Sequence, residues 1–254
     1  MSEIVMVVDT ETVSTTKPFC YNTGWVVAAI DKKGNMQTLE EKEYMTKEVW
    51  YNTMLFSTAY YADKKPIYRK EIRKHNIKVT RFENIIAEMI ESINKYNVSR
   101  VYAYNSSFDK KVFEFMTEWF HTPNPLAELP ILDIRAYFMD LVKNSNKFKN
   151  YCEKHKLFTE SGNYSTTAEV AYRYFTKEDN FIEAHTALAD SKIELVILSM
   201  CAKYGSDIFT ELTALKSIPR KQIKDITLKY KEKNYTFKGF SATWYKKRNT
   251  LIIK

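Results

Sequence analysis

The sequence predicts an α/β protein in which helices cover a mixed β-sheet. Strand-like segments come first, at about residues 4–9, 24–31 and 36–45, and helical and strand-like patterns then alternate as far as residue 204. This order is typical of a mixed sheet with helices on its faces. With 254 residues, of which 44% are hydrophobic, the chain can bury a full core.

Clear signals bound the first three strands. The first is an apolar run, 4–8, that ends at two carboxylates, and the residues 32–35 (Lys-Lys-Gly-Asn) predict a hairpin turn between the second and third. The next segment, 46–78, shows no clear period. It is rich in aromatic side chains and has helical stretches on either side of Pro66.

Helix and strand alternate in the middle of the chain. Thr80 and Glu83 match a capping box, which predicts a helix over about 80–95. The apolar side chains of this segment recur with a helical period. A short buried strand is expected at 100–104, because its apolar run is followed directly by polar residues.

More helices follow this strand. Ser106 or Ser107 can cap a helix that reaches about Phe120, and the turn-rich stretch 121–130 then breaks the chain. Thr166 and Glu169 match a second capping box. Gly205 is expected to end the last helix. The remaining predicted helices are 134–143, 166–176 and 186–204.

The chain changes in charge and pattern near Gly205. Residues 203–254 hold 13 Lys or Arg and 4 Asp or Glu, a net charge of +9, so the preceding residues carry −1 of the total of +8. We predict a domain over 1–205 and a basic, β-rich extension over 206–254. A basic region beside a nearly neutral body favours a polyanionic partner, although a solvated lysine-rich surface has the same composition. The extension alternates like strands at 226–230, 235–240 and 242–253, with a turn at 231–234.

The composition excludes several protein classes. The 5 glycines are scattered, so they build neither a Walker A loop nor a dinucleotide-binding fingerprint. Cys20, Cys152 and Cys201 are far apart and odd in number, which suits a reducing compartment rather than a disulfide framework or a zinc site. No apolar run approaches the roughly 18 residues of a membrane span. We therefore expect a cytoplasmic protein, of a bacterium or a phage-infected host, that binds no membrane.

The first candidate site is Asp9-Thr10-Glu11, at the end of the first strand. Side chains alternate along a strand, so Asp9 and Glu11 point to the same side. Two carboxylates so placed repel each other unless a cation lies between them, and Mg²⁺ and Mn²⁺ prefer oxygen ligands. A solvated strand end is the alternative interpretation.

The second candidate is Asn105-Ser106-Ser107-Phe108-Asp109, which follows a buried strand and opens a helix. Asp109 is expected in the first helical turn, where the helix dipole favours a carboxylate. The same residues also suit an ordinary helix start. The pattern alone therefore does not distinguish a metal ligand from a capping residue.

The third candidate is the segment from His185 to Asp190, with the sequence His-Thr-Ala-Leu-Ala-Asp. Residues five positions apart are about 140° apart around a helix of 3.6 residues per turn. His185 is therefore expected just before the helix or in its first turn, with Asp190 inside the helix. This arrangement places a mobile imidazole above a fixed carboxylate.

Taken together, the three segments resemble the motifs of the DEDDh exonucleases. Asp-Thr-Glu-Thr at a strand end, Asn-x-x-Phe-Asp at a strand-to-helix junction and His-x-Ala-x-x-Asp at a late helix occur here in the order of that DnaQ-like family. The family belongs to the ribonuclease H-like superfamily and includes the proofreading subunit of bacterial DNA polymerase III. The resemblance covers about residues 4–204. It implies a ribonuclease H-like mixed sheet of five strands flanked by helices.

The resemblance also implies a reaction. It is metal-dependent 3′→5′ hydrolysis of phosphodiester bonds at the ends of single-stranded DNA or RNA, with release of nucleoside monophosphates. The implied cofactors are two divalent cations, Mg²⁺ or Mn²⁺, and His185 would be the general base, a role that suits an imidazole pKa of about 6.5. The implied metal ligands are Asp9, Glu11, Asp109 and Asp190.

Other implied roles are more specific to the substrate. Thr12 would contact the sugar of the terminal nucleotide, and Asn105 matches a motif position that contacts substrate or only supports the loop. Asp133 lies near a structural acid of the family, and we expect it to be structural. Family members often carry a glycine soon after the first motif, where this chain has Val-Ser-Thr-Thr at 13–16.

Substrate choice and partners stay open. The aromatic residues between Trp50 and Tyr68 suit core packing better than base stacking, whereas the aromatic and basic extension suits either a solvated sheet or a single-strand-binding surface. The alternative function is a non-catalytic or structure-selective nucleic-acid-binding protein that keeps the fold. A proofreading role would need a separate polymerase, so a replication or repair protein is a candidate partner.

Overall fold

A six-stranded mixed sheet is the centre of the fold, in the strand order β4-β3-β2-β1-β5-β6. The structure, a computed structural model, describes residues 2–220, 224–230, 233–240, 242–245 and 250–253. β1 is antiparallel to β2 and parallel to β5, and β6 is parallel to β5. The strands of this sheet are β1 (Ser2–Thr12), β2 (Cys20–Asp31), β3 (Met36–Thr46), β4 (Lys78–Thr80), β5 (Arg100–Ala103) and β6 (Ile131–Asp133).

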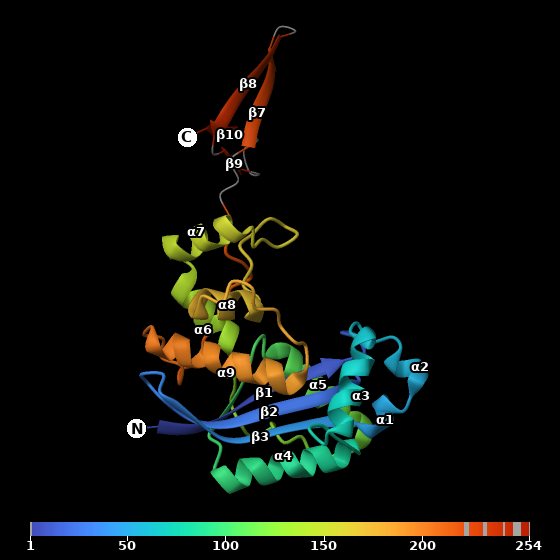
Figure 1. Ribbon diagram of the computed structural model, residues 1–254. Coiled ribbons are helices and arrows are strands. Elements are labelled where there is room, and N and C mark those ends of the chain that lie inside the picture. The colour runs from blue at the N-terminus through green and yellow to red at the C-terminus, as the bar shows by residue number, and fades with distance from the viewer. Residues whose placement is uncertain (1, 221–223, 231–232, 241, 246–249, 254) are drawn as a thin grey trace.

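Helices cover both faces of the sheet, with α9 along one face and α4 along the other (Figure 1). The predicted class, an α/β fold in which helices flank a mixed sheet, is confirmed. The helices are α1 (Lys47–Trp50), α2 (Thr53–Phe56), the 3-10 helix η1 (Ala62–Lys64), α3 (Lys65–Arg73), α4 (Phe82–Tyr96), α5 (Ser107–Phe120), α6 (Ile134–Val142), α7 (Asn146–His155), α8 (Ala168–Thr176) and α9 (Ala187–Lys203).

The apolar run of β1 is buried on both sides, which is why it does not alternate in polarity. Val5 and Val7 belong to the core cluster that α6, α8 and α9 complete. Met6 and Val8 belong to a second cluster that α4 and α5 complete. β1 is therefore a central strand, and its carboxyl end lies between helices from both faces.

The sheet has six strands where the family resemblance implied five. β4 is only three residues long and runs parallel to β3 beside its end. A segment of three residues is too short to show a strand period, and β6 has the same length. α7 was also not expected. Its residues Asn146–His155 are mostly polar or charged, and Phe148 and Cys152 are the two that it buries.

The two predicted capping boxes, at the starts of α4 and α8, are not formed. Arg81 is the N-cap of α4 without a side-chain cap, and Glu48 of α1 accepts a hydrogen bond from Phe82 N–H at 3.2 Å instead. α8 begins at Ala168, and its N-cap is Thr167 rather than the expected Thr166; the Thr167 hydroxyl accepts from Val170 N–H at 3.3 Å. Tertiary contacts thus decide which donor satisfies each helix end.

The segment between β3 and β4 packs as a third core cluster beside the end of β1 (Figure 1). Trp50, Phe56 and Tyr68 are buried against Tyr21 of β2, so core packing, the favoured interpretation, holds for these aromatic side chains. Tyr60 differs, because it is 86% exposed. Pro66 lies in the first turn of α3, where its missing N–H costs no hydrogen bond.

Residues 206–220 pack on the body of the protein. Ile208 and Ile218 are buried in the main core cluster, and the hydroxyl of Tyr102 donates to Ile208 O at 2.8 Å. The proposed domain boundary at residue 205 stays a prediction, and these contacts favour a boundary near 220. Within the described part of the chain, none of the helices has the length and apolar character needed to cross a membrane.

The C-terminal region forms two antiparallel hairpins. β7 (Lys224–Tyr230) pairs with β8 (Lys233–Phe240), and β9 (Ala242–Tyr245) pairs with β10 (Thr250–Ile253). The single strand expected over 242–253 is therefore two strands. Part of the turn expected at 231–234, residues 231–232, lies outside the described residues.

Candidate metal centre

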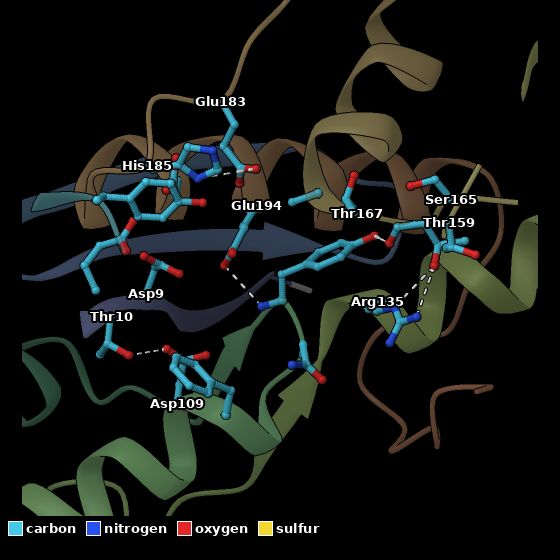
Figure 2. Close-up of a pocket in the computed structure, with 18 residues that line it drawn as sticks. Asp9, Thr10, Asp109, Arg135, Thr159, Ser165, Thr167, Glu183, His185 and Glu194 are labelled. Atoms are coloured by element: carbon cyan, nitrogen blue, oxygen red, sulfur yellow. Dashed lines mark hydrogen bonds and ion pairs between the residues drawn. The ribbon is translucent and has the colours of Figure 1, made fainter. Parts of the chain in front are cut away.

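A pocket of about 380 Å³ lies at the carboxyl end of β1. Ligands of open α/β sheets commonly bind in this position, where strands end and helices begin. The structure brings all five predicted catalytic side chains to this pocket, from β1 and from the starts of α5 and α9 (Figure 2). The five are Asp9, Glu11, Asp109, His185 and Asp190. Asn105, a predicted substrate contact, lines the pocket as well.

Thr12, the other predicted substrate contact, is not among the residues that line the pocket within the described part of the chain. Its hydroxyl donates to Ser14 O at 3.1 Å, and the register of β1 against β2 shifts between Glu11 and Thr12. The contact of Thr12 with a terminal sugar therefore stays a prediction.

Asp109 is held in place by the strand that carries the other carboxylates. The hydroxyl of Thr10 donates to Asp109 Oδ1 at 2.7 Å, and both groups are buried. Asn105 turns the chain from β5 into α5 with a left-handed φ of 66°, a conformation that asparagine tolerates. Its N–H donates to Asp133 Oδ1 at 3.0 Å. Asp133 is also the N-cap of α6, which confirms its expected structural role.

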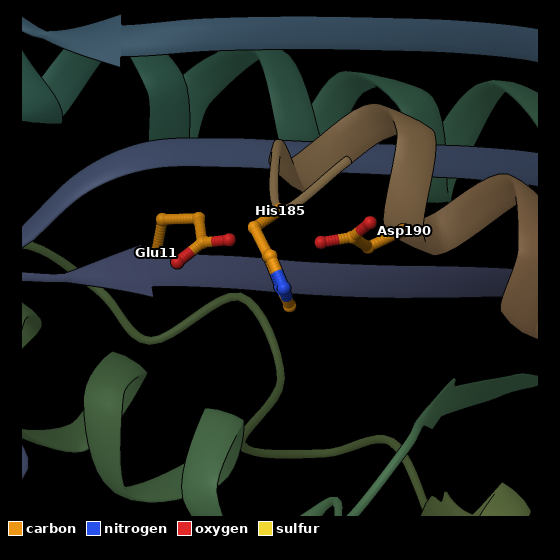
Figure 3. Close-up of side chains that lie close together, drawn as sticks. All are labelled: Glu11, His185 and Asp190. Atoms are coloured by element: carbon orange, nitrogen blue, oxygen red, sulfur yellow. The ribbon is translucent and has the colours of Figure 1, made fainter. Parts of the chain in front are cut away.

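The side chains of Glu11, His185 and Asp190 form one cluster (Figure 3). Each offers a ligand atom, and these atoms lie within 4.8 Å of one another. Asp9 Oδ2 and Asp190 Oδ1 are buried and make no hydrogen bond within the described part of the chain. Buried carboxylate oxygens without donors are the ligands that a hard divalent cation such as Mg²⁺ or Mn²⁺ prefers. The residues present therefore fit the implied metal.

The carboxylates of the pocket are electrostatically strained. Burial, reinforced by Asp190, raises the pKa of Glu11 to about 9. Burial, reinforced by Glu183, raises the pKa of Asp190 to about 8. Burial raises the pKa of Asp9 well above its usual value, and the charge of Glu194 adds to the effect. Without a cation, these raised pKa values favour protonated carboxyl groups. A divalent cation that binds here would therefore be strongly attracted by the carboxylates.

Contacts between β2 and α9 bring the third motif, His185 to Asp190, beside the first motif, Asp9 to Glu11. An added Cβ at Gly24 would meet Leu188 N at 2.2 Å, so only glycine allows α9 to approach the sheet this closely. Asn22 accepts a hydrogen bond from Ala187 N–H at 2.9 Å and fixes the first turn of α9. Gly24 pairs with Asp9 across the strands. The same contact therefore places Asp190 beside the carboxylates of β1.

We expect Gly24→Ala to push the first turn of α9 away from the sheet. The backbone overlap should lower the free energy of unfolding by about 1–3 kcal/mol, the usual cost of overpacking. Mn²⁺ affinity should fall as well, because Asp190 moves away from Asp9. Calorimetric titration with Mn²⁺ and thermal melting measure the two effects.

Gly205→Ala is the matched control for this change. An added Cβ at Gly205 meets nothing within 4 Å, although the φ of +100° makes alanine unfavourable there. It should lower stability without affecting Mn²⁺ affinity. Equal Mn²⁺ affinity in Gly24→Ala and the unchanged protein would show that α9 does not position a metal ligand through Gly24.

The segment between β3 and β4 contacts both the backbone and the ring of His185. His185 has a left-handed φ of 52°. Its ring stacks on Tyr61 with centroids 4.4 Å apart and an interplanar angle of 15°, and its carbonyl accepts from the hydroxyl of Tyr68 at 3.2 Å. Lys64 donates to the carbonyl of Ala184. Burial, and then the charge of Lys64, lower the pKa of His185, so its neutral form is populated at neutral pH.

Several pocket residues were not found by the motifs. Glu194 is buried and follows Asp190 by four positions, so both lie on one face of α9, and this spacing could have identified it. Gly24 had a signal as well, because a glycine inside an apolar strand often marks a close approach of another backbone. Glu183 and Tyr61 come from segments without a readable pattern, whereas Arg135 lies in the first turn of α6, which was predicted; no local signal marks any of the three as a pocket residue.

Comparisons with known proteins extend this description at the level of the fold. No family model matches the sequence, and no curated protein matches it at a significant level. Solved structures of exonuclease I share the fold at 15% sequence identity. One has product bound (TM-score 0.50, 79% of this chain, 43% of that chain) and another is E. coli exonuclease I in complex with a dT13 oligonucleotide (TM-score 0.51, 78% of this chain, 40% of that chain). A third, described as an ExoI/SSB-Ct complex, has a TM-score of 0.50 and covers 81% of this chain and 42% of that chain. The chain spans about two fifths of the length of these proteins.

Proposed function

We propose that this protein is a metal-dependent 3′→5′ exonuclease that acts on single-stranded nucleic acid and releases nucleoside monophosphates. The observation that carries the proposal is the pocket at the end of β1, where residues of three separate motifs meet around buried carboxylates and an imidazole. Such a set suits the hydrolysis of a phosphodiester. Among substrates, single-stranded DNA comes first, since a structure with this fold, that of E. coli exonuclease I, contains a dT13 oligonucleotide.

The four motif carboxylates are the proposed metal ligands. Asp9, Glu11, Asp109 and Asp190 would together hold two divalent cations, Mg²⁺ or Mn²⁺. When bound, the cations supply an activated water and stabilise negative charge on the phosphate and the departing oxygen. Two positive ions would also offset the burial, and the repulsion added to it, that raise the pKa of Glu11 and Asp190.

His185 is the proposed general base. Its neutral imidazole would take a proton from the attacking water while the water oxygen bonds to phosphorus and the bond to the 3′ oxygen of the next nucleotide breaks. Glu183 Oε2 lies 3.9 Å from Nδ1, where its charge would favour the imidazolium that forms. Tyr61 stacks on the ring and would keep it facing the pocket.

Further contacts with the substrate and with a partner are proposed as well. Asn105 lines the pocket and would contact the substrate, and Thr12, at the end of β1, would contact the terminal sugar. The basic extension, 206–254, would provide a second contact for the strand. A replication or repair protein is the proposed partner class. One exonuclease I structure is an ExoI/SSB-Ct complex, so SSB is the first partner to test.

A degradation assay tests the function. Single-stranded DNA and RNA of equal sequence, labelled at the 5′ end, are incubated with the protein and Mn²⁺, and with EDTA in a parallel lane. We expect a metal-dependent ladder that shortens from the 3′ end, with DNA degraded faster than RNA. Intact strands in every lane, with retarded mobility on a native gel, would instead favour a non-catalytic binding protein. Selective cleavage of nicked or duplex DNA would favour the structure-selective alternative.

A further inference from the structure

The pocket has a second end, which is lined by a positively charged side chain and hydroxyl groups instead of carboxylates. Arg135, Thr159, Ser165 and Thr167 lie together at this end, away from Asp9, His185 and Glu194 (Figure 2). We propose that Arg135 and the neighbouring hydroxyls bind the phosphodiester group on the 5′ side of the scissile one. The pocket would then hold two successive phosphates of the strand. This inference rests on the proposed exonuclease function and names a binding site within it.

Arg135 is a half-buried cation that forms no ion pair within the described part of the chain. Its guanidinium donates to Thr166 Oγ1 at 3.2 and 3.3 Å. Asp133, the carboxylate nearest in sequence, accepts through Oδ1 from the backbone N–H groups of Asn105 and Arg135, at 3.0 and 2.9 Å, and forms no ion pair with the guanidinium within the described residues. A guanidinium has five N–H donors in a planar fork that matches a phosphate, so donors of Arg135 stay available to a ligand in the pocket.

The hydroxyl groups around Arg135 suit an anion as well. Thr166 Oγ1 accepts from Arg135, and Thr167 Oγ1 accepts from Val170 N–H at 3.3 Å. A hydroxyl that accepts a hydrogen bond keeps its own O–H as a donor. Ser165 adds a third hydroxyl to the lining. A cation with several O–H donors around it is the usual way in which proteins contact the backbone phosphates of nucleic acids.

Tyr104 makes hydrogen bonds at both ends of the pocket. Its backbone N–H donates to Glu194 Oε2 at 3.2 Å, and its hydroxyl donates to Thr166 O at 2.8 Å. Tyr104 and the hydrogen bonds at its two ends therefore join the carboxylate end of the pocket to the Arg135 end. A strand that runs along Tyr104 from a scissile phosphate at the carboxylates would bring the phosphate on its 5′ side toward Arg135.

The test compares two substrates that both release thymidine 5′-monophosphate but differ in the leaving group and in whether a second phosphate follows the scissile one. One is a short oligothymidylate, and the other is the 4-nitrophenyl ester of thymidine 5′-monophosphate, which has no second phosphate. We expect Arg135→Gln to lower kcat/KM for the oligonucleotide by roughly 10- to 100-fold, the loss typical of a hydrogen bond to a charged group. Hydrolysis of the nitrophenyl ester should change by less than about twofold.

A neutral linkage provides an independent readout on the unchanged protein. An oligothymidylate with a methylphosphonate at the second linkage from the 3′ end should be degraded roughly 10- to 100-fold more slowly than the normal strand. Arg135→Gln should show no further loss on this substrate, because the interaction is already absent. Should Arg135→Gln fail to fold, the methylphosphonate result on the unchanged protein decides alone, and an undiminished rate overturns the proposal.

The remaining outcomes separate this site from the proposed function. Equal losses on the oligonucleotide and the nitrophenyl ester would show that Arg135 only ties α6 to α8 through Thr166, and the binding site would be rejected. No loss on either substrate would reject it too. If the unchanged protein hydrolyses neither substrate, the exonuclease proposal itself fails. Arg81→Gln is the matched control, because Arg81 is exposed and pairs with Glu83 far from the pocket lining.

Discussion

Asp9→Asn is expected to lower the rate of strand cleavage by roughly 10³-fold or more, since loss of a metal ligand removes several kcal/mol of transition-state stabilisation. Asparagine keeps the shape of the side chain and lowers only its charge and its affinity for cations. The fold should therefore persist. Single-turnover cleavage of a labelled strand with saturating Mn²⁺ measures the loss.

The same substitution should stabilise the metal-free protein. Burial raises the pKa of Asp9 well above its unfolded value, so the folded state holds this proton to a higher pH than the unfolded state. The contribution of Asp9 to the free energy of unfolding is then complete below about pH 4 and is lost as the pH rises toward the folded pKa. In EDTA, Asp9→Asn should melt at a higher temperature than the unchanged protein at about pH 8, and the gap should shrink at about pH 5.

Asp63→Asn is the control, because Asp63 is an exposed carboxylate on η1 outside the pocket lining. It should change neither the cleavage rate nor the pH dependence of melting. An Asp9→Asn protein that cleaves normally would remove the basis for the metal centre.

His185→Ala is expected to slow cleavage by roughly 10²- to 10⁴-fold, the usual contribution of a general base. The loss should lie in kcat, and Mn²⁺ affinity should change little. Burial and Lys64 lower the pKa of His185 from 6.5, so the neutral base is present at neutral pH and the rate of the unchanged protein should fall only at a more acidic pH. His185→Ala should lack this acidic limb.

His155→Ala serves as the control, because His155 lies on α7 beside Tyr151 and Asp179, outside the pocket lining. A large loss of Mn²⁺ affinity in His185→Ala would show instead that the imidazole is a metal ligand, which its distance from Glu11 and Asp190 permits. Stopped-flow rates across the pH range, together with calorimetric titration of Mn²⁺, distinguish the two roles.

The central strands, and the strand and helix ends that carry the candidate catalytic residues, could be predicted from the sequence. The run that ends at Asp9 is apolar on both faces, and the segment after His185 has a long helical pattern that ends at Gly205. Both signals are local and strong. The order of the motifs along the chain then indicated which strand and helix ends would meet, and the structure brings their side chains into one pocket.

The features that were not predicted depend on contacts between distant segments. β4 exists because three residues reach the edge of β3, and the start of α4 is satisfied by Glu48 from another helix rather than by its own capping box. Tyr61 and Arg135 enter the pocket from a segment without a period and from the first turn of α6. No local pattern encodes such an approach, which arises only once the sheet has assembled.

Crystallographic Mn²⁺ sites, located by anomalous scattering after soaking with Mn²⁺ and a thymidylate product, would test the central claim most directly. We expect two strong peaks in the pocket at the end of β1, held together by Asp9, Glu11, Asp109 and Asp190. Asp9→Asn should remove or weaken both. A protein that cleaves DNA with Mn²⁺ but shows no peak near Asp9, or shows its peaks elsewhere, would contradict the account.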